Sequence, residues 1–282
     1  MPKFEATCAV SIFKQSLKGL LETGIWKISP EGLKYQGYRK FDIEHEFDIT
    51  LMAELYLSPT EFEKFECKEE FLMGINPKHF RTVLNCADWT DNVVFIIEED
   101  ANHLDLIILS ERGGCKKSQT FELKFISVEG IKKFSESKYL EYECELEMPS
   151  ERFVDITNAI RKISANKNDI KICMTRKKVM FESVGDSKCL KSTVTITPRD
   201  KDYSYKSSGS VEVFFRNIFL HYPAQNKLLS DKIWLKCSKQ KWFVVEYKIQ
   251  KCGYLKYYML PLTEKQHSKK KGNSWKQQRF NE

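Results

Sequence analysis

The stretch FVVEYKIQKCGYLKYYMLPLTE (residues 243–264) is rich in aromatic and aliphatic side chains that alternate between two faces, as in a β-strand. Pro261 ends the strand, because proline has no N–H for the ladder of hydrogen bonds, and frees the chain to run along the surface. Tyr258, Met259, Leu260 and Pro261 have two interpretations. In the first, these residues form one wall of an apolar groove. In the second, the tyrosines only complete a sheet, and the residues alone favour this second interpretation.

The composition around this stretch is that of a folded protein. Of 282 residues, 41% are hydrophobic and 13% aromatic, which excludes wholesale disorder. No apolar run approaches the roughly 18–20 residues of a membrane span, and MPKFEATCAV lacks the features of a secretory signal. The nine cysteines show no CxxC spacing, so neither a disulfide framework nor a zinc site is expected. We expect a soluble intracellular protein without a metal or cofactor.

Most of the net charge of +7 lies at the C-terminal end of the chain. Residues 265–282 contain six basic side chains and one acidic one, which leaves +2 for residues 1–264. A solvated charge run is one reading of this segment, and a phosphate-binding arm or a nuclear-localisation signal is the other. We prefer nuclear import and expect a nuclear protein.

The two halves of the chain read as copies of one module of two helices and many antiparallel strands. In the first half, residues 4–36 give a strand, an amphipathic helix and two strands joined at SPEG (29–32). In the second, strands are expected at 169–174 and 178–183, after a helix that begins at a Ser150 N-cap. The apolar face of that helix consists of Phe153, Ile156 and Ile160.

Each half also carries a second predicted helix. In the first half, Asn76 is the N-cap, Pro77 takes the first helical position, and an apolar stripe continues to Ala87. In the second half, the helix is expected near VEVFFRNIFLHY (211–222) and is followed by Pro223.

Four segments together resemble one family: LKYYMLP (255–261), VVEYKI (244–249), FLMGINPKHFRTVLNCA (71–87) and YECELEMPSERF (142–153). They are similar to the eukaryotic DNA sliding clamps, the proliferating cell nuclear antigen (PCNA) family. The resemblance implies an α+β fold of two tandem clamp domains that form a ring, with antiparallel sheets outside and helices lining a central hole. The expected boundaries are an N-terminal clamp domain at 1–125, an interdomain connector at 126–141, a C-terminal clamp domain at 142–264 and a basic flexible tail at 265–282.

The resemblance also implies three sets of site residues. The expected DNA-binding residues are Lys14, Lys18, Lys78, Arg81, Arg161, Lys162 and Arg216. The expected groove for partner peptides contains Tyr38, Ile131, Phe134, Tyr258, Met259, Leu260 and Pro261. Subunits are expected to pair through 118–125 of one copy and 189–196 of the next, with Phe121, Leu123, Leu190 and Val194 at the interface.

The chain departs from the family pattern in its connector and its helices. The connector, ISVEGIKKFSESKYLEY (126–142), contains three lysines where the family is acidic. Neutral or acidic residues stand at several helix positions that are usually basic, namely Gln15, Leu21, Thr82, Asn85, Asp155, Asn158 and Pro223. Duplex DNA presents about one phosphate charge per 1.7 Å, so we expect only modest, salt-sensitive contact with it.

The expected function is that of a sliding clamp, a processivity factor that encircles double-stranded DNA and tethers replication and repair proteins. Its partners would be polymerases, repair enzymes and a clamp loader, in a homotrimer or heterotrimer. Two alternatives stay open: a subunit of a heterotrimeric DNA-damage checkpoint clamp, or an interaction module that no longer encircles DNA. No GxSxG or GxxxxGK[ST] motif is present, so an enzyme is not expected.

Overall fold

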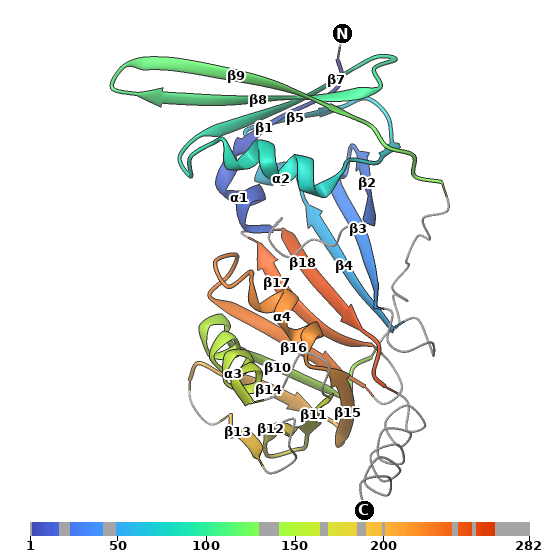
Figure 1. Cartoon of the computed structure of the whole chain (residues 1–282), viewed down its shortest axis with the longest axis vertical. Coiled ribbons are helices and arrows are strands. Elements are labelled where there is room, and N and C mark those ends of the chain that lie inside the picture. Colours follow the sequence, from blue (N-terminus) through green and yellow to red (C-terminus); the bar gives the residue numbers. More distant parts are fainter. Residues whose placement is uncertain are drawn as a thin grey trace, which may run out of the picture. The chain divides into compact units, whose positions relative to one another are not determined.

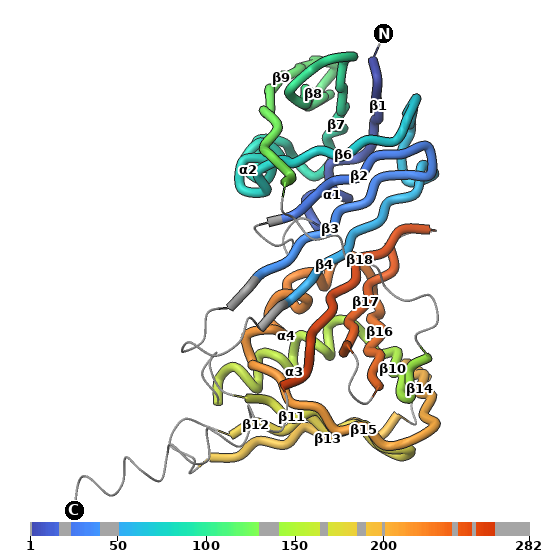
Figure 2. The backbone as a smooth tube through the Cα atoms, turned by 90° about the vertical axis from the view of Figure 1, so that its right-hand side faces the viewer, coloured from blue at the N-terminus to red at the C-terminus, as the bar shows by residue number. Residues whose placement is uncertain are grey.

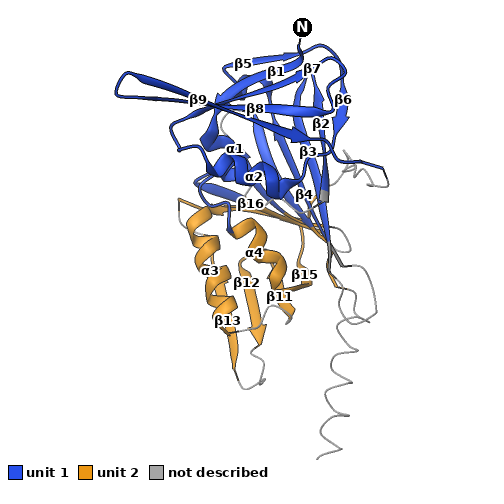
Figure 3. Cartoon of the chain, turned by 45° about the horizontal axis from the view of Figure 1, so that its top comes forward, with its two compact units in different colours: residues 1–140, 225–233, 245–258 blue, residues 141–224, 234–244, 259–282 orange. Residues whose placement is uncertain are grey.

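The computed structural model describes residues 2–16, 23–41, 49–129, 141–163, 169–184, 190–198, 201–238, 242–249 and 252–262. The predictions for Lys18, Ile131, Phe134 and the basic tail lie outside these residues. The chain divides into two compact units, coloured separately in Figure 3. Unit 1 comprises Met1–Leu140, Gln225–Ile233 and Val245–Tyr258, and unit 2 comprises Glu141–Ala224, Trp234–Val244 and Met259–Glu282. Among the described residues, no helix has the length and apolar character needed to cross a membrane.

The described part of unit 1 contains two α-helices, one short 3-10 helix and most of the long strands (Figure 1). Its elements are β1 (Pro2–Ala9), α1 (Val10–Ser16), β2 (Thr23–Ser29), β3 (Gly32–Phe41), β4 (Ile49–Leu57), the 3-10 helix η2 (Pro59–Glu61), β5 (Lys64–Cys67), β6 (Phe71–Met73), α2 (Pro77–Asn85), β7 (Asn92–Glu98), β8 (His103–Arg112) and β9 (Cys115–Lys124). Most residues of β17 (Phe243–Ile249) and β18 (Gly253–Met259) also belong to it.

The strands of unit 1 form two antiparallel layers. One is a five-stranded sheet in the order β5-β1-β7-β8-β9. In the other, β18, β4, β3, β2 and β6 follow one another, and the tube in Figure 2 shows β2, β3, β4 and β18 running alongside each other. In this sheet β18 lies between β17 and β4, so strands from the two ends of the sequence are neighbours.

Aromatic side chains join the helices of unit 1 to both layers. Phe13 of α1 lies 5.9 Å from Phe80 of α2 and 4.8 Å from Phe95 of β7, between ring centroids. Trp26 of β2 stacks edge-on against Phe80 at 5.6 Å. Aromatic pairs at these distances add to the gain from burial, so the two short helices are fixed mainly by packing.

The predicted start of α2 is confirmed. The Asn76 side chain accepts hydrogen bonds from the backbone N–H groups of Lys78 (2.9 Å) and His79 (3.4 Å), and Pro77 occupies the first turn. These bonds satisfy donors that have no partner inside a helix. Phe80, Val83 and Leu84 form the buried stripe, as the sequence predicts.

Unit 2 repeats the sequence of strand, helix and strands. Its elements are β10 (Cys144–Pro149), α3 (Ser150–Ile163), β11 (Asp169–Met174), β12 (Val179–Val184), β13 (Lys191–Ile196), β14 (Ser204–Ser207), β15 (Val211–Arg216), α4 (Ile218–Ala224) and most of β16 (Lys232–Cys237). One sheet has the order β13-β12-β11-β15, and in the other β14, β10 and β16 are neighbours. The predicted face of α3, Phe153, Ile156 and Ile160, is buried.

The predicted helix near 211–222 is wrong in its first half. Residues 211–216 form strand β15, which pairs with β11, and the helix begins only at Ile218. The reason is the period of the pattern: Val211, Val213 and Phe215 are buried while the residue between each pair is not, which is the alternation of a strand. Pro223 lies inside α4 rather than after it.

Candidate nucleic-acid interface

In unit 1, the surface of α1 and α2 offers few free positive charges. The two helices are neighbours (Figure 1). Lys78 is exposed near the start of α2, and Arg81 is half-buried one turn further on. The exposed positions beyond it are Thr82 and Asn85, which are uncharged. The described part of the helical face is therefore only weakly basic in this unit.

Lys14 is held by two contacts at the end of α1. Its ammonium group donates a hydrogen bond to the backbone oxygen of Ala87, just beyond the C-terminal end of α2. The same group lies 5.6 Å from the centroid of the Trp89 ring. A cation is stabilised both by the negative end of a helix and by the face of an aromatic ring. Lys14 thus joins the two helices as well as adding charge.

Arg81 combines a partly buried stem with an unmatched donor. Its Nε atom is buried and has no hydrogen-bond partner among the described residues. Its positive charge acts on Tyr35, whose pKa is raised by burial and lowered in part by Arg81. The residue as a whole is half-buried on α2.

In unit 2, the basic charge lies in the last turn of α3. Arg161 and Lys162 are both exposed there. The Nη1 atom of Arg161 lies 3.3 Å from Nδ1 of His221 on α4. Burial, and then the positive charge of Arg161, lower the pKa of His221 below the usual value of histidine. A neutral imidazole at neutral pH therefore accepts a hydrogen bond from the guanidinium group.

Arg216 does not fit its predicted DNA-binding role. It ends strand β15, and the residue is 6% exposed. Its Nη1 atom lies 2.6 Å from Oδ1 of Asp169 on β11, and the two side chains are 7% and 12% exposed. A guanidinium paired inside the protein neutralises an internal carboxylate and is not presented to a phosphate. Residue type alone could not show that Arg216 is paired, because its partner Asp169 lies 47 residues away in the sequence, on another strand.

The predicted groove residues divide into core and surface. Tyr258 and Met259 are 0% exposed, whereas Leu260 is 45% exposed and Pro261 is half-buried. Tyr38, on β3, is half-buried. The burial of Tyr258 and Met259 fits the alternative that these residues complete the sheet. Only Leu260 and Pro261 offer surface of the predicted wall.

The two segments predicted to join subunits are both outermost strands. β9 ends the five-stranded sheet of unit 1, and β13 ends the four-stranded sheet of unit 2. Leu123 is 7% exposed and Leu190 is 52% exposed, while Phe121 and Val194 are half-buried. An outermost strand presents unpaired N–H and C=O groups that another strand can satisfy.

The β8–β9 hairpin extends beyond the rest of its sheet (Figure 1). Pairing of β8 with β7 ends at Leu109, whereas pairing with β9 continues to Arg112 and Cys115. The two residues of the turn, Gly113 and Gly114, have φ values of 57° and 79°. These are values that glycine adopts freely and that tight hairpin turns require.

Two surface features of unit 1 are not predicted from the sequence. The first is Trp89, which is 45% exposed and lies beside Lys14. The second is the ion pair between Arg112, at the end of β8, and Asp88, which precedes Trp89 in the loop after α2. A tryptophan inside the polar segment ADWTDN is a signal that could have identified the first. The second depends on the hairpin folding over the end of α2, which no local pattern encodes.

Two units of antiparallel strands, each with two α-helices among its described residues, define the class of this protein: it has the fold of a DNA sliding clamp. Sequence models of the proliferating cell nuclear antigen match the chain twice, the N-terminal domain at residues 3–131 and the C-terminal domain at residues 137–262. The chain therefore belongs to the proliferating cell nuclear antigen family, and the predicted α+β clamp fold is confirmed.

Among solved structures, the chain is similar to the proliferating cellular nuclear antigen of Entamoeba histolytica. The TM-score is 0.78 at 21% sequence identity, and the match covers 93% of this chain and 100% of that chain. The likeness at this identity concerns the fold. Contacts with DNA and with partner proteins depend on this chain's own surface.

Proposed function

We propose that this protein is a sliding clamp that closes into a ring around double-stranded DNA and tethers replication and repair proteins. The observation that carries the proposal is the pair of outermost strands, β9 in unit 1 and β13 in unit 2. With one open strand in each unit, β9 of one copy can pair head-to-tail with β13 of the next. Such pairing forms a closed ring when the rotations between successive copies add up to a full turn.

Contact with DNA would come from the helices and would not depend on base sequence. Lys78, Arg81, Arg161 and Lys162 supply charge that reaches the surface, and Lys14 is partly engaged within unit 1. So few phosphate contacts imply weak affinity and a small slope of log K against log[salt], so that little binding is left at moderate salt. Retention on DNA would then rest on topology rather than on affinity.

Partner proteins would dock through short peptides near the end of β18. Leu260 and Pro261 are the surface residues of the predicted groove that the structure describes there. A peptide anchor that covers Leu260 would bury apolar area, and a buried anchor is worth about 2 kcal/mol or more. We place the protein in the nucleus, with a role as a scaffold rather than as an enzyme.

The experiment that tests encirclement uses linear duplexes with free or blocked ends. The protein is allowed to thread onto DNA before streptavidin caps are added to biotinylated ends, and the complex is then washed at 0.5–1 M salt. We expect the capped duplex to retain the protein and the uncapped duplex to lose it by sliding off. Equal loss from both would reject encirclement.

A second candidate is a subunit of a heterotrimeric checkpoint clamp. The weakly basic helices favour it, because one subunit of a mixed ring can leave most phosphate contacts to the others. In that case the isolated chain would remain a monomer and would be retained on capped DNA only after its partners are added.

A further inference from the structure

The strand β5 has an open edge that the proposed ring does not use. It is the outermost strand of its sheet on the side opposite to β9, and among the described residues it pairs only with β1. The register joins Phe4 with Cys67 and Glu5 with Glu66. Just beyond the strand, the Lys68 N–H donates to the Lys3 oxygen at 3.3 Å.

This hydrogen bond fixes which backbone groups face outward. In an antiparallel ladder, every second residue exchanges both of its bonds with its partner. Because Lys68 bonds directly to its partner Lys3, the backbones of Glu66 and Lys64 also face β1. The N–H and C=O groups of Phe65 and Cys67 therefore point away from the sheet, toward the open edge.

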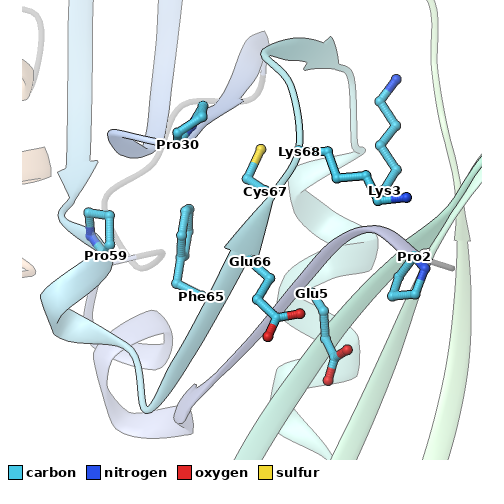
Figure 4. A pocket seen from close by; sticks show the side chains of 9 residues that line it. All are labelled: Pro2, Lys3, Glu5, Pro30, Pro59, Phe65, Glu66, Cys67 and Lys68. Carbon is cyan, nitrogen blue, oxygen red and sulfur yellow. The ribbon is translucent and has the colours of Figure 1, made fainter.

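A pocket of about 480 Å³ lies along that edge (Figure 4). Its lining includes Phe65 and Cys67, together with Glu66 and Lys68, which lie on the other face of the sheet. Pro30 and Pro59 close it from the far side, and neither proline has an N–H group to fill the edge. Pro2, Lys3 and Glu5 of β1 also line the space, where it continues over the face of the sheet that carries Glu66. The part between β5 and the two prolines lies at the open edge (Figure 4), where a further strand would lie.

The side chains along β5 also specify a pattern. The sequence KFECK (64–68) places Phe65 and Cys67 on one face and Lys64, Glu66 and Lys68 on the other. The charged side chains are accessible, at 41% for Lys64, 67% for Glu66 and 50% for Lys68. Their present partners are Glu5, 2.8 Å from Lys64, and Glu99, 3.7 Å from Lys68, with Glu66 and Lys64 3.6 Å apart.

We propose that the β5 edge binds an extended peptide segment of a partner protein as an added strand. The complementary sequence is acidic–apolar–basic–apolar–acidic. Its charged residues lie opposite Lys64, Glu66 and Lys68, since opposite charges on neighbouring strands attract. Its apolar residues face Phe65, Cys67 and the two prolines, and its backbone satisfies the open N–H and C=O groups. This site is separate from the DNA-facing helices and from the β9 edge.

The apolar positions of the peptide should carry small or β-branched side chains. Pro30 and Pro59 bound the pocket on the side opposite to β5, so there is room for a single added strand and its apolar side chains must be short. The Cys67 thiol already donates to the Glu69 oxygen at 3.1 Å, and burial raises its pKa. It therefore acts as a neutral, apolar neighbour rather than as a reactive group.

The test uses a dye-labelled, terminally blocked peptide with the core Glu-Val-Lys-Val-Glu between glycine–serine flanks, titrated against the full chain. We expect saturable binding, slower hydrogen exchange at the Phe65 and Cys67 amides, and loss of binding when both valines are N-methylated. Glu66→Lys should weaken binding about tenfold, since it reverses the central pair. The peptide Glu-Val-Glu-Val-Glu should restore binding to Glu66→Lys alone.

The matched control is Glu111→Lys, because Glu111 is 66% exposed and lies on the β8–β9 hairpin. It should leave the peptide affinity unchanged. Absence of binding, or binding that ignores the charge exchange, would overturn the proposal. A change in oligomeric mass caused by Glu66→Lys would also overturn it, because a second copy of the chain would then occupy the edge. None of these outcomes depends on whether the protein encircles DNA.

Discussion

Lys14 shows why residue type and residue role differ on the helical face of unit 1. Its ammonium group meets the end of α2 at the Ala87 oxygen and the ring of Trp89. Lys78 has no ion-pair partner among the described residues and is exposed. Both residues are lysines on neighbouring helices, yet one charge is largely satisfied within the protein and the other is free for a phosphate.

This difference predicts opposite effects for two alanine variants. Lys14→Ala should lower the free energy of unfolding by about 1 kcal/mol, because it removes a cation from a helix end and from an aromatic ring. Lys78→Ala should leave stability unchanged and reduce the slope of log K against log[salt] for DNA binding by about 0.9. Denaturant titration and salt titration measure the two quantities. Equal salt slopes for the two variants would contradict this assignment.

His221 predicts a pH dependence of stability in unit 2. Its pKa in the folded protein lies below the ordinary 6.5, through burial and then Arg161. As the pH falls below 6.5, the unfolded state binds the proton first, so folding stability falls with pH until the folded pKa is reached. His221→Gln should abolish this loss of stability below pH 6.5, which thermal unfolding at a series of pH values measures. Parallel curves for the two proteins would count against it.

The buried pair of Arg216 and Asp169 predicts a large effect on stability and none on DNA. Arg216→Met removes the guanidinium group that lies 2.6 Å from the Asp169 carboxylate, in a site where the Asp169 side chain is 12% exposed. Breaking a buried pair in this way costs about 3–5 kcal/mol. The salt slope of DNA binding by the folded variant should equal that of the wild type. A reduced slope would restore the DNA-binding role of Arg216.

At the level of elements, the sequence predicts those features that depend on residues close together in the chain. The cap and the apolar stripe of α2 follow from Asn76, Pro77 and a spacing of three and four residues. The helix predicted near 211–222 is wrong for residues 211–216, because the alternation of Val211, Val213 and Phe215 is that of a strand, which pairs with β11. The burial of Tyr258, in contrast, depends on sheet neighbours rather than on its own segment.

The cap of α2 offers a prediction at this scale. Asn76→Ala removes the acceptor of two backbone N–H groups and should lower the free energy of unfolding by about 1 kcal/mol. Asn76→Asp keeps the acceptor and serves as the matched control, with stability close to that of the wild type. Equilibrium denaturation compares the three proteins, and equal losses in both variants would show that the cap contributes nothing.

At the level of the whole molecule, family-specific segments carried more information than composition. LKYYMLP and the three other family-like segments predict two clamp domains. The matches of family models to residues 3–131 and 137–262 confirm this prediction. The surface chemistry did not follow from them. Which lysine is free, which arginine is buried and which strands remain open are set by contacts between residues far apart in the sequence.

Assembly through β9 is the step on which the proposed role depends. The two-residue turn at Gly113 and Gly114 makes Arg112 and Cys115 a hydrogen-bonded pair, so alternate residues of β9, including Thr120, direct their N–H groups to the open edge. Thr120→Pro removes one such donor without breaking the bonds to β8. Thr120→Ala keeps the donor and is the matched control.

The most direct measurement is the mass of the purified chain in solution by light scattering. We predict three times the chain mass of 33.2 kDa for the wild type and for Thr120→Ala, and a shift to a single chain for folded Thr120→Pro. A wild-type protein that stays at the mass of one chain at micromolar concentration would contradict closure of this chain with copies of itself.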